Sequence, residues 1–393
     1  MVTYLNCMAL ALGISAGLSS APRLGTPFTN TKSLSFDGTD DVVDTGFQPD
    51  FIHTNATMAY WVNMDDFTSN QNCGTHNSKR FYLGFSSSKA AMGVQNANNL
   101  GSGADLSAYI AVGQWHHIAM VADGGTATYY LDGVARDTLS YTQNSASNPS
   151  GNIFVGAMSH SSTAHFMNGS IDEFAMWSSA LTSDEVAALY NAGVPTDLTK
   201  NSGAYVSSSN LQAYYRMGDA TLPAPDGTSN FIFDQVDTSL GSELIANGSF
   251  DGVADGTDPV GNVSNYFAYG SPTTRQITGG QLQLTTDGSN EGVRLNVPSL
   301  TAGVAYQIQM DISGDGSDIG AAVYISGGGN NQVPARTNGK IDTIFAPSTA
   351  NIYLYLRAGD NTAGTTFYDN ISVKQLNGKT ATISGATIQT DTP

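Results

Sequence analysis

The sequence predicts an all-β protein made of two antiparallel β-sandwich (jelly-roll) domains, with one short helix after the first sandwich. The first observation is composition: the helix formers Lys, Arg and Glu are scarce, with four glutamates among 33 acidic residues, whereas Gly, Asn, Ser and Thr abound. The second is length, because 393 residues with 40% hydrophobic content can form two cores. The third is the recurrence of short segments that alternate apolar and polar side chains between turns.

The charge balance excludes two classes of ligand. Fifteen Lys and Arg residues stand against 33 acidic ones, for a net charge of −18. Phosphate backbones and anionic lipids both require clustered basic residues, so we expect neither nucleic-acid binding nor membrane binding or insertion. The two cysteines, Cys7 and Cys73, are too few for a disulfide framework, and we expect free thiols.

The N-terminal segment is expected to be an anchor. Residues 5–21 are uncharged and rich in Ala, Gly, Leu and Ser, but no Lys or Arg precedes them, as a secretory signal would require. The run also holds too few large apolar residues for a membrane span. We therefore expect residues 1–29 to form an N-terminal arm that packs into a partner protein.

The first sandwich is expected over residues 30–198. Asp-Gly pairs at 123–124 and 132–133 lie where tight hairpin turns belong. The expected strands are residues 32–36, 58–64, 80–85, 115–122, 126–131, 152–157 and 170–177. Thr182 and Glu185 form a capping box that predicts a helix, and Gly193 is expected to end it.

The remainder of the chain divides into three parts. Residues 199–243 are expected to be a linker with one strand-like segment, and residues 377–393 a Thr-rich, extended C-terminal tail. Between them, residues 244–376 predict the second jelly roll. Its expected strands are residues 281–285, 292–297, 305–312, 321–326, 341–345, 352–358 and 366–375.

Three sets of motifs mark the first sandwich in order. They are SLSFDGTDDVV at 33–43, WHHIA at 115–119 with YYLDG at 129–133, and GSIDEFAMW at 169–177 before the helix. Their order and spacing resemble the laminin-G-like, concanavalin A-like β-sandwich in its bacterial and phage variety. The resemblance implies an antiparallel sandwich of the lectin type.

Two further stretches carry weaker resemblances. LIANGSFD at 244–251 and FYDNISV at 367–373 are similar to the opening and closing strands of a carbohydrate-binding-module jelly roll. FTNTKSLSFDG at 28–38, after a short arm, resembles structural proteins of marine tailed phages. The second likeness is one of sequence style and implies a component of a virion.

Two catalytic motifs are missing from the sequence: the Glu-x-Asp-x-x-Glu strand of glucanases on this sandwich and the His-Glu-x-x-His zinc helix. Asp172 and Glu173 are adjacent, so on a regular strand they point to opposite faces and cannot act as a pair of carboxylates. We expect Glu173 to be a charged residue at the rim. His116 and His117 face opposite ways for the same reason, and we expect no enzyme.

Calcium is the expected ion, because it takes oxygen ligands from Asp carboxylates and turn carbonyls. The resemblance implies one structural site with Asp172 beside the turn that holds Asp37 and Asp40. A second would join Asp251 on the first strand of the jelly roll to Asp369 on the last. The alternative is that these aspartates only cap turns.

A glycan is the expected ligand of the second domain, because sugar sites on sandwiches combine exposed aromatic rings with polar side chains. Tyr353 and Tyr355 alternate onto one face of a strand, which suits a platform but also a buried or subunit-facing position. The candidate residues are Tyr266, Phe267, Tyr269, Tyr353, Tyr355 and Arg357.

These observations predict a non-enzymatic structural protein of a tailed, marine phage, either a fibre or spike or a capsid decoration, at the virion surface. Its expected partners are other virion proteins, bound through the arm, further copies of itself in a homo-oligomer, and a host-surface glycan. One alternative is a secreted or cell-surface carbohydrate-binding adhesin. Another is a glycan depolymerase.

Overall fold

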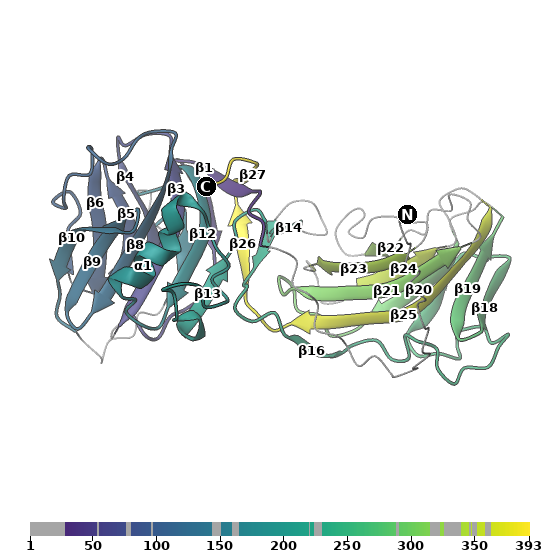
Figure 1. The fold of residues 1–393 in the computed structure, drawn as a ribbon. Helices are drawn as coiled ribbons and strands as arrows, with labels where there is room; N and C mark the ends of the chain where they lie inside the picture. The colour runs from purple at the N-terminus through teal and green to yellow at the C-terminus, as the bar shows by residue number, and fades with distance from the viewer. Residues whose placement is uncertain are drawn as a thin grey trace, which may run out of the picture.

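The protein folds into two β-sandwiches that lie side by side (Figure 1). The computed structural model describes residues 28–52, 55–75, 80–95, 97–143, 151–158, 165–219, 221–223, 230–287, 291–314, 323–325, 339–345, 347, 352–357 and 363–393. Within these residues the chain is nearly all-β and the sheets are antiparallel, as predicted. The expected N-terminal arm lies almost wholly outside the described residues.

The first sandwich consists of an eight-stranded and a nine-stranded sheet. The eight-stranded sheet contains, in spatial order, β10 (Val134–Ser140), β9 (Thr126–Leu131), β8 (Trp115–Asp123), β3 (Ala56–Met64), β12 (Asn168–Trp177), β1 (Ser33–Asp37) and β27 (Thr387–Gln389), with β13 (Leu211–Tyr215) also paired to β12. The nine-stranded sheet contains β14 (Thr221–Pro223), β15 (Asn230–Phe233), β26 (Thr380–Ser384), β2 (Val42–Asp44), β11 (Phe154–Val155), β4 (Asn70–Thr75), β5 (Arg80–Ser86), β6 (Lys89–Gln95) and β7 (Ala97–Asn98).

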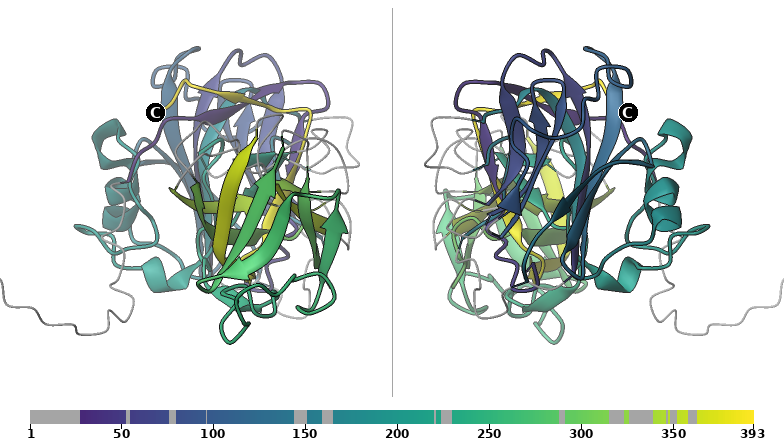
Figure 2. Two further views of the ribbon diagram at one scale, coloured as in Figure 1. Left: turned by 90° about the vertical axis from the view of Figure 1, so that its right-hand side faces the viewer. Right: turned by 90° about the vertical axis from the view of Figure 1, so that its left-hand side faces the viewer.

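Both faces of the eight-stranded sheet are covered. Met58 and Tyr60 of β3 enter the core between the sheets, whereas Ala59 packs against the layer that contains the helix. All nine residues of β3 are consequently buried. Figure 2 shows the helical segment on the outer side of the first sandwich.

The predicted helix is α1 (Ser183–Tyr190), and its capping box is confirmed. Thr182 Oγ1 accepts the Glu185 N–H at 3.2 Å, and Glu185 Oε2 accepts the Thr182 N–H at 2.9 Å. Asn191, at φ 44°, ends the helix two residues before the expected Gly193. The 3₁₀ turns η1 (Asn191–Gly193) and η2 (Ser208–Asn210) follow. No helix among the described residues is long and apolar enough to cross a membrane.

The second sandwich places a six-stranded sheet against a four-stranded one, with a separate apolar core between them. The six-stranded sheet contains β18 (Thr274–Thr278), β19 (Gln281–Thr286), β25 (Gly364–Leu376), β21 (Tyr306–Gly314) and β23 (Gly339–Phe345), with β16 (Leu240–Glu243) also paired to β25. The four-stranded sheet contains β17 (Tyr266–Tyr269), β20 (Gly292–Val297), β24 (Ile352–Arg357) and β22 (Val323–Ile325).

The second sandwich is inserted into the first one. Strands β13, β14 and β15, within the expected linker, join the first sandwich, and so do β26 and β27, within the expected C-terminal tail. Strands β13, β15 and β26 bury apolar residues in the first core, such as Ala381 and Ile383 of β26, and this burial stabilises them there. The two connections between the sandwiches lie side by side, because the Asn377 N–H donates to Ser239 O at 3.0 Å. The domain boundaries thus differ from the expected ones at 198 and 377.

Candidate functional site

One face of the four-stranded sheet gathers aromatic and arginine side chains. On β24, Ile352, Leu354 and Leu356 are at most 1% exposed and point into the core. Strand alternation therefore directs the intervening side chains away from the core. The face that results, here called the aromatic–arginine face, consists of Phe267, Tyr269, Arg294, Tyr353, Tyr355 and Arg357.

The rings on this face contact one another edge to face. The centroids of Tyr269 and Tyr355 are 4.9 Å apart with planes at 78°, and those of Phe267 and Tyr353 are 6.4 Å apart at 85°. Tyr353 and Tyr355 follow each other along β24 at 6.4 Å. Edge-to-face pairs of this kind are favourable by about 0.5–1.5 kcal/mol each, so the rings hold one another in place.

Each arginine lies over two of the rings. Arg294 Cζ is 5.1 Å from the centroid of Tyr353 and 5.8 Å from that of Phe267. Arg357 Cζ is 5.1 Å from the centroid of Tyr269 and 5.8 Å from that of Tyr355. Cation–π attraction holds the guanidinium groups against the sheet, which fixes their positions before any ligand arrives.

Most of the glycan-binding candidates from the sequence lie on this face, and one does not. Tyr269, Tyr353, Tyr355 and Arg357 come together as expected, with Phe267. Tyr266 does not: it is 3% exposed and packs in the core on Phe250, and burial raises the pKa of its hydroxyl. Sequence reasoning missed Arg294, although its place between the buried Val293 and Leu295 indicates an outward side chain.

A second cluster consists of three aspartates in the turn after β1. Carboxylate oxygens of Asp37, Asp40 and Asp41 lie within 4.8 Å of one another. Asp41 is 7% exposed, and its pKa is raised by burial and by its two acidic neighbours, although the Asp37 N–H donates to it at 2.9 Å. Three hard oxygen donors at this spacing fit a calcium ion.

Asp172 lies away from this cluster, unlike in the expected set. The antiparallel register of β1 and β12 places Asn168 opposite Asp37. Asp172 is four residues further along β12, roughly 13 Å away at the rise of a strand. The third carboxylate of the cluster is Asp41, which follows Asp40 directly in the sequence.

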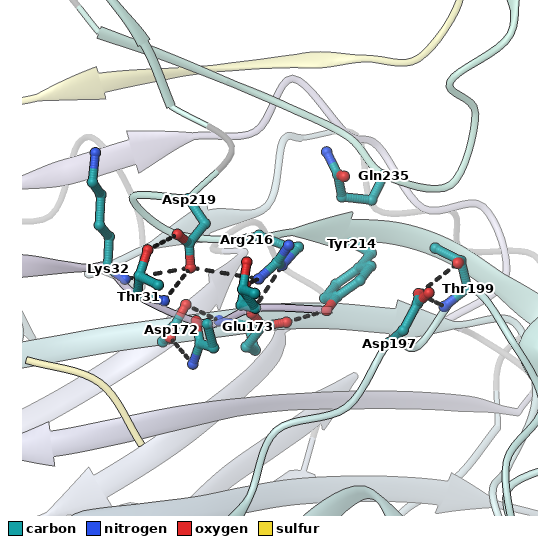
Figure 3. Close-up of polar contacts among 12 residues, drawn as sticks. Thr31, Lys32, Asp172, Glu173, Asp197, Thr199, Tyr214, Arg216, Asp219 and Gln235 are labelled. Carbon is teal, nitrogen blue, oxygen red and sulfur yellow. Dashed lines mark hydrogen bonds and ion pairs between the residues drawn. The ribbon is translucent and has the colours of Figure 1, made fainter. Parts of the chain in front are cut away.

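Asp172 and Glu173 form a buried network where β12 bulges. Glu173 has φ 51°, and the register of β12 with β3 shifts between Asp172 and Ala175. The bulge breaks strand alternation, so the two carboxylates lie side by side (Figure 3) instead of on opposite faces as expected. Glu173 is 3% exposed and therefore not at the rim.

The chain itself encloses both carboxylates. Asn30 Nδ2 donates to Asp172 at 2.8 Å, and Arg216 Nε donates to Glu173 at 3.1 Å. Tyr214 also donates to Glu173 through its hydroxyl. Burial raises the pKa of Glu173 to about 7 despite Arg216, and burial together with Glu173 raises the pKa of Asp172 well above its usual range.

The same network holds the first described residues to the sandwich. Asp219 accepts the backbone N–H and the hydroxyl of Thr31 at 2.8 and 2.6 Å. Arg216 donates to Thr29 O and lies over the Phe28 ring at 4.3 Å. Residues 28–31 are thus fixed beside β12 and β13.

Asp251 and Asp369 make local contacts. Asp251 accepts the hydroxyl of Ser249 at 2.7 Å, and Asp369 accepts the N–H of Asn370 at 2.7 Å. Asp369 lies opposite Asp311 in the register of β25 and β21. In the described part of the chain, no group of three potential metal-binding side chains forms around them, and a second calcium site stays a prediction.

The adjacent histidines have separate surroundings. The Ala111 N–H donates to His116 Nε2 at 3.2 Å, so His116 Nδ1 carries the proton shared with Asp132 at 2.8 Å. His117 packs on Trp61 with centroids 5.2 Å apart, and burial lowers its pKa to about 4. His117 is thus a packed core side chain, and His116 is held by two hydrogen bonds.

Comparison with known proteins identifies the fold of the first sandwich. Residues 37–187 match the family model of the concanavalin A-like lectin/glucanases superfamily, Laminin_G_3. This match confirms the resemblance drawn from the motifs of the first domain. No curated protein matches the sequence.

Solved structures of lectin type and carbohydrate-binding type resemble parts of the chain. A native heptameric SAP-like pentraxin from Limulus polyphemus is 14% identical, with 42% of this chain and 83% of that one covered and a TM-score of 0.35. A protein from Bacteroides ovatus, named for carbohydrate binding, is 16% identical over 53% and 56%, with a TM-score of 0.37. The N-terminal cellulose-binding domain of β-1,4-glucanase C from Cellulomonas fimi is 19% identical over 34% and 97%, with a TM-score of 0.26. Likenesses this weak carry no conclusion about what the chain binds.

Proposed function

We propose that the chain is a non-enzymatic carbohydrate-binding protein and that the aromatic–arginine face is its glycan site. The observation that supports this is the gathering of four rings and two guanidinium groups on one outward sheet face. Phe267 is 43% exposed, although it is a large apolar ring. The apolar faces of sugar rings stack on such side chains, while arginine and tyrosine groups bind the sugar oxygens.

The other sheet of the second sandwich offers a less suitable surface. Its pocket of about 400 Å³ is polar and contains Glu243, Gln309, Asn370, Ser372 and Lys374 among its lining residues. None of its described lining residues is aromatic. A sugar there would gain hydrogen bonds but no stacking, which favours the aromatic–arginine face.

The surroundings of Asp172 and Glu173 support binding rather than catalysis. Hydrolysis of a glycosidic bond needs two carboxylates that reach the substrate from either side. Asp172 is 0% exposed, Glu173 is 3% exposed, and Asn30, Tyr214 and Arg216 occupy their oxygens. A sugar would have to displace these partners to reach either carboxylate.

Substitution of Tyr353 and of Tyr355 by alanine tests the glycan site in the full-length protein. On a glycan array followed by calorimetry, we expect each variant to bind about tenfold more weakly, because each loses one stacking surface. Tyr109→Ala is the matched control: Tyr109 is 51% exposed but belongs to the first sandwich. Binding of no glycan by the wild type, or unchanged affinity in Tyr355→Ala, would contradict the proposal.

Calcium belongs to the proposal as a structural ion at Asp37, Asp40 and Asp41. The aromatic–arginine face contains no carboxylate, so the ion would stabilise the first sandwich and take no part in binding sugar. The glycan measurements are therefore to be repeated with a chelator, under which the affinity should persist.

The setting we propose is the surface of a tailed-phage virion, where the second sandwich would contact host glycans. The support is the likeness of residues 28–38 to phage structural proteins and the fixed point at Thr29 and Thr31 from which the arm departs. A secreted or cell-surface adhesin is the alternative.

Removal of residues 1–27 should leave a folded protein that binds glycan but no longer enters particles. Normal incorporation of the truncated chain would refute the anchoring role.

A further inference from the structure

The four-stranded sheet is free of acidic residues in a chain rich in them. Its strands read YFAY, GVRLNV, VYI and IYLYLR, with two arginines and neither Asp nor Glu. The six-stranded sheet behind it, by contrast, contains Glu243, Asp311, Asp342 and Asp369. The six side chains of the aromatic–arginine face therefore carry two positive charges and no negative one, on a protein of net charge −18.

The hydrogen-bonding groups of this face are mainly donors. Arginine has five N–H donors and no acceptor, so Arg294 and Arg357 can bind only oxygens that accept. The acceptors among its described side chains are tyrosine hydroxyls and the amide of Asn296, which pairs with Tyr353 across β20 and β24. A neutral sugar hydroxyl needs an acceptor as well as a donor, whereas a carboxylate or sulfate only accepts.

The arginines are held in positions that suit an anion. Each guanidinium lies over two rings, and Arg357 Nη2 also lies 3.4 Å from the Tyr269 hydroxyl. Contact with the rings removes part of the water from the charge, which strengthens its attraction to an anion at short range. A planar guanidinium also matches the paired oxygens of a carboxylate or sulfate.

We infer that the ligand of the aromatic–arginine face is an anionic polysaccharide, whose sugar rings stack on the tyrosines while its carboxylate or sulfate groups bind Arg294 and Arg357. This inference rests on the proposed function and names its substrate class. The acidic remainder of the protein does not oppose it at moderate salt, because charges farther away than about 8 Å are screened at 0.15 M.

The test uses three oligosaccharides of equal length with the full-length protein in 0.15 M salt: an oligogalacturonate, a sulfated galactan and a neutral cello-oligosaccharide. Calorimetry should show the anionic oligosaccharides binding about tenfold more tightly than the neutral one. Arg294→Gln and Arg357→Gln should each lower the ratio of anionic to neutral affinity by about threefold. Lys340→Gln removes an exposed charge from the six-stranded sheet and should leave that ratio unchanged.

Each outcome decides a different point. Tight binding of only the oligogalacturonate or only the sulfated galactan supports the inference and identifies carboxylate or sulfate as the group bound. Equal or tighter binding of the neutral oligosaccharide, lost in Tyr355→Ala, overturns the inference and leaves the proposed function standing. If none of the three oligosaccharides binds but the glycan array identifies another ligand, the inference fails and the proposed function stands; if nothing on the array binds either, both fail. Asn296→Asp adds a carboxylate to the aromatic–arginine face. Among the variants, it should lower the affinity for the anionic oligosaccharides most.

Discussion

At the scale of single residues, we expect the Asp172–Glu173 pair to make the stability of the first sandwich depend on pH. Burial raises the pKa of Glu173 from near 4.5 to about 7, and the pKa of Asp172 is raised as well. Between pH 4.5 and about 7, Glu173 binds a proton more strongly in the folded protein than in the unfolded chain. The free energy of unfolding therefore falls as the pH rises through that range. For Glu173 alone this loss is on the order of 3 kcal/mol at neutral pH.

Asp172→Asn isolates this effect, because asparagine has nearly the same shape and cannot ionise. Urea unfolding between pH 4.5 and 7.5 should give a shallower decline in the variant than in the wild type. Asp123→Asn changes an exposed carboxylate at the end of β8 and should keep the wild-type slope. Parallel slopes for the wild type and Asp172→Asn would show that Asp172 does not titrate in this range.

The residues of the candidate site were predictable where strand alternation holds. Tyr353, Tyr355 and Arg357 alternate with three core residues on β24, so their common face follows from the sequence. Tyr266 belongs to a short edge strand of four residues, whose few positions do not show which side faces the core. Arg294 was missed because its importance comes from Phe267 and Tyr353, which are distant in sequence.

At the scale of elements, the local sequence pattern predicts the regular strands and the capped helix. It does not predict the bulge in β12 or the strand β26. The bulge at Glu173 depends on its partners Tyr214 and Arg216 of the β13 region, so no pattern within β12 reveals it. Strand β26 is a weak candidate by itself, with a Thr-rich sequence. It becomes a strand because β2 and β15 flank it and bury Ala381 and Ile383.

At the scale of the whole molecule, the chain leaves the first sandwich for the jelly roll and returns from it at one place. The Asn377 N–H donates to Ser239 O at 3.0 Å, and the Asp234 N–H donates to Lys379 O at 2.8 Å. Because the two connections are so close, the first sandwich does not need the second to hold its strands in register. The inserted domain can then carry the proposed glycan site without altering the core of the first sandwich.

Excision of residues 240–376 tests this arrangement. With Ser239 joined to Asn377 through two glycines, the remaining chain should melt cooperatively. The two residues are already within hydrogen-bond distance, so a short linker can connect them without strain. Truncation after residue 376 is the matched comparison, since it keeps the jelly roll but removes β26 and β27. That loss of buried Ala381, Ile383 and Ala386 should lower the melting temperature of the first sandwich by about 10 °C. An excised protein that fails to fold, beside a truncated protein of wild-type stability, would mean that the jelly roll and not the C-terminal strands holds the first sandwich together.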